Sequence, residues 1–267
     1  MTLPRWVRAA AHVGRVGELT RCVRRVKNWR AVARRYLGLG GSYPLAFVTR
    51  FGHRLELMTH HDLVTAWVIF CRREYRVPPQ ARLIVDLGAN IGAFSFHAVE
   101  AAPSALIVAA EPFPSTFDRL VSHVTANGLT ARVVCRRAAV GIRAGVRRMS
   151  AEGPSQSRGL LPEESPAGDS RIEVAVHTLG QILDDARRAA PGRGIDFLKI
   201  DVEGAEHEFV HGLPDGSLAD VHEVGMEYHP NGDKAALFAA LAGHGLIPVR
   251  DCVFGPNVGV AHFRRRG

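Results

Sequence analysis

The stretch that decides the fold is Leu83–Gly92, which reads LIVDLGANIG. Its first half is apolar apart from Asp86, and glycines stand at Gly88 and Gly92. A short apolar run bounded in this way predicts a buried strand, and the glycines predict a sharp turn of the backbone. A helix is expected next, at Ala93–Ala101. A strand, a glycine-rich turn and a helix together form the first unit of an open sheet that binds ligands at its carboxyl edge.

Downstream of this unit, buried strands continue to alternate with amphipathic helices, which predicts a parallel sheet. After the strand at Leu83–Leu87, we expect strands at Ala105–Ala110, Ala131–Arg136, Phe197–Asp201, Val221–Tyr228, Leu246–Asp251 and Val258–Phe263, and helices at Pro114–Asn127, Leu179–Ala189, Ala205–Val210 and Lys234–Gly243. The last two strands are too close in sequence for a helical crossover, so they must pair antiparallel. The predicted fold class is α/β, with a mostly parallel seven-stranded sheet that ends in an antiparallel strand hairpin.

The region before the sheet differs in pattern. We expect a basic helical N-terminal arm at 1–40, a hairpin and helix at 41–80, and the core domain at 81–267. The arm has apolar residues every three or four positions, as in one or two amphipathic helices. Leu45–Arg50 and Arg54–Met58 predict a β-hairpin, and a helix is expected at about Asp62–Tyr75. Within the core, Met149–Ser170 is rich in Ser, Gly, Pro and Glu, and we expect a mobile loop over the ligand face there, between strand-like pieces at Gly145–Arg148 and Ile172–His177.

The positive charge of the chain is concentrated in the arm. Residues 1–40 hold ten Lys or Arg and one acid, Glu18, so the arm has a net charge of +9. The whole chain has a net charge of +8, so the remaining residues sum to −1. A nucleic-acid partner is not expected, since it would want basic residues around the ligand site. The arm is expected to be solvated or docked on the protein, with peripheral contact to an anionic membrane as the alternative, because Trp6 and Trp29 accompany the arginines.

Other features exclude several classes of protein. The longest apolar runs, such as Leu63–Cys71, are far shorter than the roughly 20 residues that cross a bilayer. Met1–Arg8 lacks the apolar core of a secretory signal, although the Arg-rich arm has the composition of a transit peptide. The four cysteines show no C-x-x-C spacing, so neither a disulfide framework nor a cysteine metal site is expected. We expect a cytoplasmic protein, with a peripheral position at the inner face of the membrane as the alternative.

Acidic residues mark the carboxyl ends of three predicted strands. Asp86 ends the first and can face an ammonium group; Glu111 ends the second and can accept both ribose hydroxyl protons, in an NAD or an S-adenosylmethionine site. The middle glycine of G-x-G-x-x-G, which makes room for a pyrophosphate, is Asn90 in this sequence. Asp201 and Glu203 follow the strand in IDFLKIDVEGAE at the same edge of the sheet. This set favours S-adenosylmethionine, which has no pyrophosphate.

These motifs in this order, VDLGANIG, AAEPFPSTFDRL and IDFLKIDVEGAEHEFVHGL, resemble the FkbM family of S-adenosylmethionine-dependent methyltransferases. HTLGQILDD and VHEVGMEYHP agree as well, and the resemblance covers about Leu55 to Phe263. It implies a class I methyltransferase (Rossmann-like) fold. It also implies O-methylation of a hydroxyl on a small-molecule or glycan acceptor: a sugar, a glycolipid or a polyketide-like secondary metabolite.

The resemblance further assigns roles to individual residues. The methionine end of the cofactor would be lined by Asp86, Gly88, Ala89, Asn90 and Gly92. Glu111 would bind the ribose, Ala138 would flank the adenine, and Asp201 would face the sulfonium. Glu203 and Glu227 would lie nearer the acceptor.

The catalytic step leaves two mechanisms open. A hydroxyl is a poor nucleophile while protonated, so a positioned base helps, and His229 in EYHP is the first candidate. Its alternative role is to fix the turn before Pro230. Asp201, Glu203 and Glu227 could instead hold a divalent cation such as Mg²⁺, which would lower the hydroxyl pKa. We favour the mechanism without a metal.

Other functions remain as alternatives. An NAD(P)-dependent oxidoreductase shares the first two acidic positions but does not account for Asn90 or the Asp201 motif. A non-catalytic S-adenosylmethionine-binding module would keep the fold without turnover. The segment His207–His211 matches the zinc-protease motif H-E-x-x-H. Its helix would be only about two turns long before Gly212 and Pro214, so we do not expect a zinc hydrolase.

Overall fold

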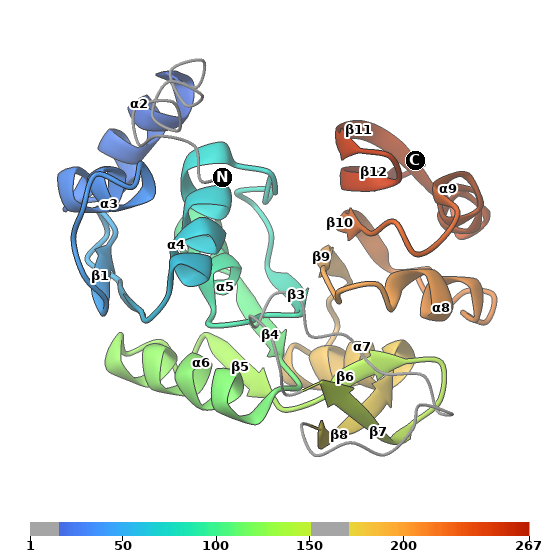
Figure 1. The fold of residues 1–267 in the computed structure, drawn as a ribbon. Coiled ribbons are helices and arrows are strands. Elements are labelled where there is room, and N and C mark those ends of the chain that lie inside the picture. Colours follow the sequence, from blue (N-terminus) through green and yellow to red (C-terminus); the bar gives the residue numbers. More distant parts are fainter. Residues whose placement is uncertain (1–15, 151–170, 267) are drawn as a thin grey trace. The chain divides into compact units, whose positions relative to one another are not determined.

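The protein is described by a computed structural model that covers residues 16–150 and 171–266. The chain forms two compact units, Met1–Glu74 and Tyr75–Gly267 (Figure 1). Residues 1–15 of the predicted arm and residues 151–170 of the predicted mobile loop lie outside the described part. The first two residues assigned to that loop, Met149 and Ser150, belong to a strand instead.

The second unit is built on a seven-stranded sheet with the strand order β11-β12-β10-β9-β3-β4-β5. Its strands are β3 (Leu83–Leu87), β4 (Leu106–Ala110), β5 (Val133–Arg136), β9 (Ile195–Ile200), β10 (Val221–Tyr228), β11 (Leu246–Gly255) and β12 (Val258–Arg265). β12 runs antiparallel to both β10 and β11, whereas the pairings of β10 with β9, β9 with β3, β3 with β4 and β4 with β5 are parallel. The predicted class I methyltransferase layout is confirmed.

The order of the strands places the ligand edge. Chain order runs outward from β3 through β4 to β5 on one side, and through β9 and β10 on the other. A parallel sheet opens a crevice at the carboxyl ends of the strands where the order reverses, and that point lies between β3 and β9. All five residues of β3 are buried, which is why the segment reads as a continuous apolar run rather than an alternating one.

Five helices connect these strands: α5 (Ala93–Ala101), α6 (Pro114–Ala126), α7 (Leu179–Ala189), α8 (Glu206–His211) and α9 (Lys234–Gly243). Local chemistry sets their ends. Pro114 opens α6, Thr178 and Gln181 form a capping box on α7, and the Asp233 carboxylate caps α9. The apolar face of α7 packs into the same core as Leu198 of β9, and this packing holds the central strands in place.

A smaller, three-stranded sheet has the strand order β6-β8-β7. Its strands are β6 (Ala139–Gly141), β7 (Gly145–Ser150) and β8 (Arg171–Thr178). The two strand-like pieces expected here are confirmed and pair antiparallel as β7 and β8. The parallel strand β6 has no counterpart in the sequence prediction, because three residues are too few to show a period.

The first unit contains two short helices, α2 (Val16–Arg25) and α3 (Trp29–Tyr36), and the predicted hairpin of β1 (Leu45–Val48) and β2 (Arg54–Leu57). The helix expected at about Asp62–Tyr75 is instead α4 (His60–Trp67) followed by a π-helical turn, η2 (Val68–Arg72). It ends at Arg73 because that residue adopts a left-handed conformation. No helix in the described residues is long and apolar enough to span a bilayer.

Candidate active site

Asp86 lies beneath the glycine-rich turn and not on its surface. The side chain is fully buried at the end of β3. Its Oδ2 accepts a hydrogen bond from Ser95 Oγ at 2.7 Å, and its Oδ1 lies 3.1 Å from the ammonium group of Lys199. The carboxylate is thus already neutralised by a protein cation. Any electrostatic effect on a ligand ammonium would act through this pair.

The turn after β3 is in backbone contact with the end of β9. Gly88 has a φ of 73°, and a Cβ placed on it would stand 1.7 Å from the carbonyl oxygen of Asp201. The amide of Asp201 donates to Leu87 O at 3.2 Å. Only glycine fits at position 88, for conformational and steric reasons together. Asn90 and Gly92, which also have positive φ, continue the turn toward α5.

Lys199 is a site residue that the sequence analysis did not identify. It lies in β9, is fully buried, and its Nζ is 3.1 Å from Asp86 Oδ1 and 3.2 Å from Asp201 Oδ2. It also donates to the carbonyl oxygen of Gly88 at 3.0 Å. Burial lowers the pKa of Lys199, but the attraction of Asp201 and Asp86 outweighs it and the pKa is raised above its usual range. A lysine inside an apolar strand was the available signal, since buried lysines are nearly always paired.

Glu111 joins two loops at the carboxyl edge. It is buried just past β4, where Oε2 accepts from the amide of Asn90 and Oε1 from the amide of Phe113, each at 2.9 Å. Burial raises the pKa of Glu111 to about 7, against these backbone hydrogen bonds, which lower it. An acid at this position can accept ribose hydroxyls, but near neutral pH it exchanges a proton easily.

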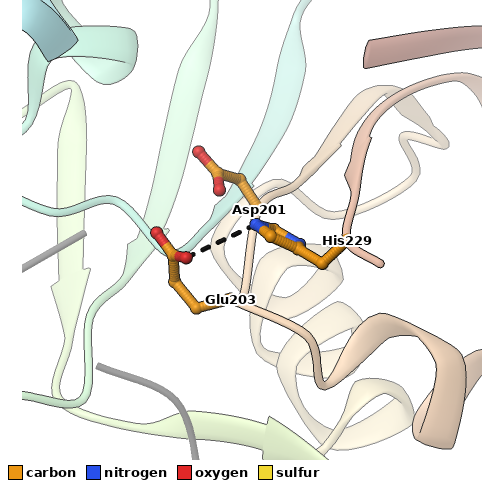
Figure 2. Close-up of side chains that lie close together, drawn as sticks. All are labelled: Asp201, Glu203 and His229. Carbon is orange, nitrogen blue, oxygen red and sulfur yellow. Dashed lines mark ion pairs between the residues drawn. The ribbon is translucent and has the colours of Figure 1, made fainter. Parts of the chain in front are cut away.

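Beyond the end of β9, three side chains converge: Asp201, Glu203 and His229 (Figure 2). One ligand atom from each lies within 4.8 Å of the others. His229 Nε2 is 3.4 Å from Glu203 Oε2, the pair marked by the dashed line. Glu203 adopts a left-handed φ of 52°, a conformation that is unfavourable for a non-glycine residue and that tends to persist at functional sites.

Glu206 holds this group in place, and it is the second residue that the sequence analysis missed. It is fully buried at the start of α8. Its Oε1 lies 3.0 Å from His229 Nδ1 and accepts the His229 amide at 2.8 Å, while Oε2 accepts the Gly204 amide at 2.9 Å. The EGAE motif contained the signal, but the partner lies 23 residues away in sequence.

Contacts among Glu203, Glu206 and His229 change the pKa of each group. Burial lowers the pKa of His229, but hydrogen bonds with Glu203 and Glu206 raise it overall to about 11. Burial raises the pKa of Glu203 despite the hydrogen bond with His229. Burial also acts to raise the pKa of Glu206, yet the hydrogen bond with His229 lowers it overall. The two paired carboxylates therefore favour the protonated form of His229, and its role as the base stays a prediction.

A cavity of about 400 Å³ opens beside Glu203. It is lined by Arg147, Glu203, Gly204, Ala205, His207, Glu208 and Asn231. Arg147 comes from β7 of the small sheet, and its Nη1 lies 3.3 Å from Glu208 Oε2 across the cavity wall. Nearly all of these side chains are polar or charged, so the cavity suits a hydrophilic group.

The remaining predicted residues fall into two groups. Ala89 and Ala138 are buried near the ends of β3 and β5, and Glu227 is half-buried in β10, where its charge helps to raise the pKa of His229. The two histidines of the H-E-x-x-H match, His207 and His211, are not part of the one grouping of potential metal ligands found within the described residues. The His207 ring lies near the His229 carbonyl instead, with Nε2 3.0 Å from that oxygen.

Comparison with known proteins is consistent with this geometry. A family model described as the methyltransferase FkbM domain matches residues 86–244, more than half of the chain. The methyltransferase sdnD of Sordaria araneosa is 29% identical over 199 residues, which cover 65% of this chain and 76% of the relative. The 31-O-demethyl-FK506 methyltransferase FkbM of Streptomyces tacrolimicus is 27% identical over 198 residues, which cover 63% of this chain and 74% of the relative.

Among solved structures, the methyltransferase FkbM from Methylobacillus flagellatus KT aligns over 96% of this chain and 60% of its own, with 14% identity and a TM-score of 0.48. The match of the family model spans all three acidic strand ends, from Asp86 through Glu111 to Asp201, and extends past His229. The chain belongs to the FkbM family of methyltransferases.

Proposed function

We propose that the protein transfers the methyl group of S-adenosylmethionine to a hydroxyl of a small, polar acceptor such as a sugar or a glycosylated metabolite. The observation that carries this proposal is that Glu203, which is paired with His229, lines the polar cavity. A carboxylate that borders a polar cavity and has a raised pKa suits a position beside an acceptor hydroxyl. The Streptomyces tacrolimicus relative is named for transfer to an oxygen, which supports the same class of reaction.

The cofactor would lie along the carboxyl edge. Gly88, Ala89, Asn90 and Gly92 provide a turn without bulky side chains, with Asp86 and Lys199 below it. Glu111 would accept the ribose hydroxyls and Ala138 would flank the adenine, whereas Asp201 would face the sulfonium. The donor set fits: the buried Asp86 and Lys199 together with the half-buried Asp201 carry a net charge of −1, which complements a cationic sulfur. When bound, the cofactor supplies an activated methyl group on that sulfur.

The protein's own residues would then prepare the acceptor oxygen. Glu203 would accept the hydroxyl proton, because its pKa is already raised and its carboxylate borders the cavity. His229, held as a cation by Glu206, would orient Glu203. Asp201 and Glu227 would keep the local field negative around the reacting atoms. Alignment of the oxygen, the methyl carbon and the sulfur would supply much of the remaining rate enhancement.

A cation-assisted reaction is the second candidate. Its ligands would be Asp201, Glu203 and His229 rather than the Asp201, Glu203 and Glu227 set considered from the sequence, and His229 would have to lose its proton to bind the ion. Glu206 lies at Nδ1 of His229, which is the position of a carboxylate that orients a metal-binding histidine. A chelator separates the two mechanisms. Loss of turnover on chelation and its recovery with Mg²⁺ would support the cation, whereas unchanged turnover would support Glu203 alone.

The test of the proposed function is methyl transfer from radiolabelled S-adenosylmethionine to a panel of glycosides and hydroxylated macrolides. We expect Glu203→Gln to reduce turnover by about 10²–10⁴-fold with nearly unchanged cofactor affinity. Glu223→Gln is the matched control, because Glu223 lies near the start of β10, pairs with Arg264 and belongs neither to the cluster nor to the cavity lining. Tight binding of NADH in place of S-adenosylhomocysteine would indicate an oxidoreductase. Cofactor binding without transfer to any hydroxyl would indicate a binding module.

A further inference from the structure

The two units of the chain carry opposite charge. Met1–Glu74 contains fourteen Lys or Arg and four Asp or Glu, a net charge of +10. Since the whole chain carries +8, Tyr75–Gly267 carries −2. The candidate active site lies in the second unit.

Three of the four acids in the first unit are directed inward. Glu18 is buried, and its Oε2 accepts from Trp67 Nε1 at 2.7 Å while Oε1 lies 3.4 Å from Arg72 Nε. Glu74 is buried 3.6 Å from Arg72 Nη1, and Asp62 is buried in the capping box of α4. Only Glu56 is exposed among these four. The outward face of the unit is thus strongly cationic.

The cations gather where the β1–β2 hairpin meets the turn between α2 and α3. The amide of Arg50 donates to Arg25 O and that of Lys27 donates to Val48 O, both at 2.7 Å. These bonds fix the hairpin turn against the helical turn. We call the surface formed by Arg24, Arg25, Lys27, Arg50 and Phe51 the basic turn surface. Arg24, Lys27 and Arg50 are exposed.

Phe51 stands at the tip of this surface with 70% of its area exposed. Other large apolar side chains of the unit are exposed as well: Val16, Leu19, Leu39 and Met58. Cations alone fit any polyanion. An exposed aromatic side chain next to cations, as Phe51 is next to Arg50, fits a bilayer, whose anionic headgroups overlie an apolar interior, better than a nucleic-acid backbone.

We propose that the first unit docks on an anionic membrane through the basic turn surface, with Phe51 entering the interface. The cations supply attraction to the headgroups, and the aromatic ring supplies apolar burial. This surface is independent of the methyl-transfer chemistry, so it stands or falls separately from the proposed function. It would hold the enzyme beside acceptors carried in or on a bilayer.

The test is flotation of the full chain with vesicles of phosphatidylcholine alone and of phosphatidylcholine mixed with phosphatidylglycerol. We expect binding only to the mixed vesicles, and loss of that binding at high salt. Arg24→Gln with Lys27→Gln should weaken partitioning about thirty-fold, and Phe51→Ser about tenfold. Phe254→Ser is the matched control, because Phe254 is 53% exposed in the second unit, and it should leave partitioning unchanged.

Thermal denaturation of each variant checks folding, and the exposure of all four positions predicts unchanged midpoints. Equal binding to neutral and anionic vesicles would overturn the proposal, as would no binding of the wild-type chain. So would Phe51→Ser binding as well as wild type. A random DNA duplex is the last competitor. If it displaces the protein from vesicles, and if Phe51→Ser leaves the affinity for DNA unaltered, the surface binds polyanions in general and the proposal is overturned.

Discussion

The ammonium group of Lys199 and the carboxylate of Asp86 form an ion pair of 3.1 Å between two adjacent strands, with both side chains fully buried. Asp201 completes the arrangement at 3.2 Å from the same ammonium group. A buried charge that loses its partner is strongly destabilising, because no solvent replaces the lost interaction. The pair therefore joins the base of the glycine-rich turn to β9, the strand that leads to Asp201 and Glu203.

Lys199→Met should lower the free energy of unfolding by about 3–5 kcal/mol, since it leaves Asp86 buried without its cation. Denaturant titration of the cofactor-free protein measures this. The control is Lys234→Met, which breaks the half-exposed ion pair of Lys234 with Asp251 and should cost at most about 1 kcal/mol. Equal losses for both variants would show that burial of the Lys199 pair has no special weight.

Cofactor affinity should depend on the ionisation of Glu111. Ribose hydroxyls donate to the ionised carboxylate, so binding favours loss of the proton. Because the pKa of Glu111 is about 7 in the free protein, affinity should be constant above pH 7 and fall by up to about tenfold per pH unit below it. Calorimetric titration with S-adenosylhomocysteine across this range measures the slope. Glu111→Gln should bind more weakly and show a flat profile, and a sloping profile in that variant would assign the proton to another group.

Gly88→Ala should be far more damaging than its conformation alone requires. Gly88 and Gly128 share a similar positive φ, 73° and 67°, but a Cβ on Gly128 would meet nothing within 4 Å. Gly128→Ala should therefore cost only the left-handed strain, about 1–2 kcal/mol. Gly88→Ala adds a clash with the carbonyl of Asp201, so it should lower the free energy of unfolding by several kcal/mol more. It should also abolish cofactor binding. Similar midpoints in thermal unfolding for the two variants would mean that the backbone of Asp201 yields.

Glu206→Gln should move the ionisation of His229 without removing the imidazole. Glu206 and Glu203 raise the pKa of His229 to about 11, so the loss of one carboxylate should lower it toward the usual range. Titration of the His229 ring signals by NMR, with a chelator present, measures the shift. Glu208→Gln changes a carboxylate outside the cluster and should leave these signals in place. A His229 that titrates near its ordinary pKa in the wild-type protein would contradict the paired arrangement.

The sheet could be predicted well because each buried strand is a short run of apolar residues that is visible in the local sequence. β3 and β10 were located to the residue, and the short gap between β11 and β12 required their antiparallel pairing. The helix expected at about Asp62–Tyr75 ran past the observed end of η2 at Arg72, because nothing local to Arg73 predicts its left-handed conformation. Strand β6 escaped detection because its pairing with β8 depends on residues more than thirty positions away.

The site was predicted as a set of positions but not as a network. The positions of Asp86, Glu111, Asp201 and Glu203 follow from strand ends, which sequence patterns locate. The parts played by Lys199 and Glu206 depend on partners in other strands and could not be read locally. The protonation of His229 depends in turn on the carboxylates of Glu203 and Glu206, and the sequence near His229 shows neither partner.

Glu111 carries two duties through one carboxylate. The same oxygens that are suited to ribose hydroxyls hold the amides of Asn90 and Phe113, one in the loop after β3 and one in the loop after β4. A substitution of Glu111 that changed its contact with a ribose would also remove the hydrogen bonds that hold both loops. The site should therefore be slow to evolve toward a different nucleotide: new specificity would have to arise from compensating changes in two separate loops at once, and single substitutions along that route would be selected against.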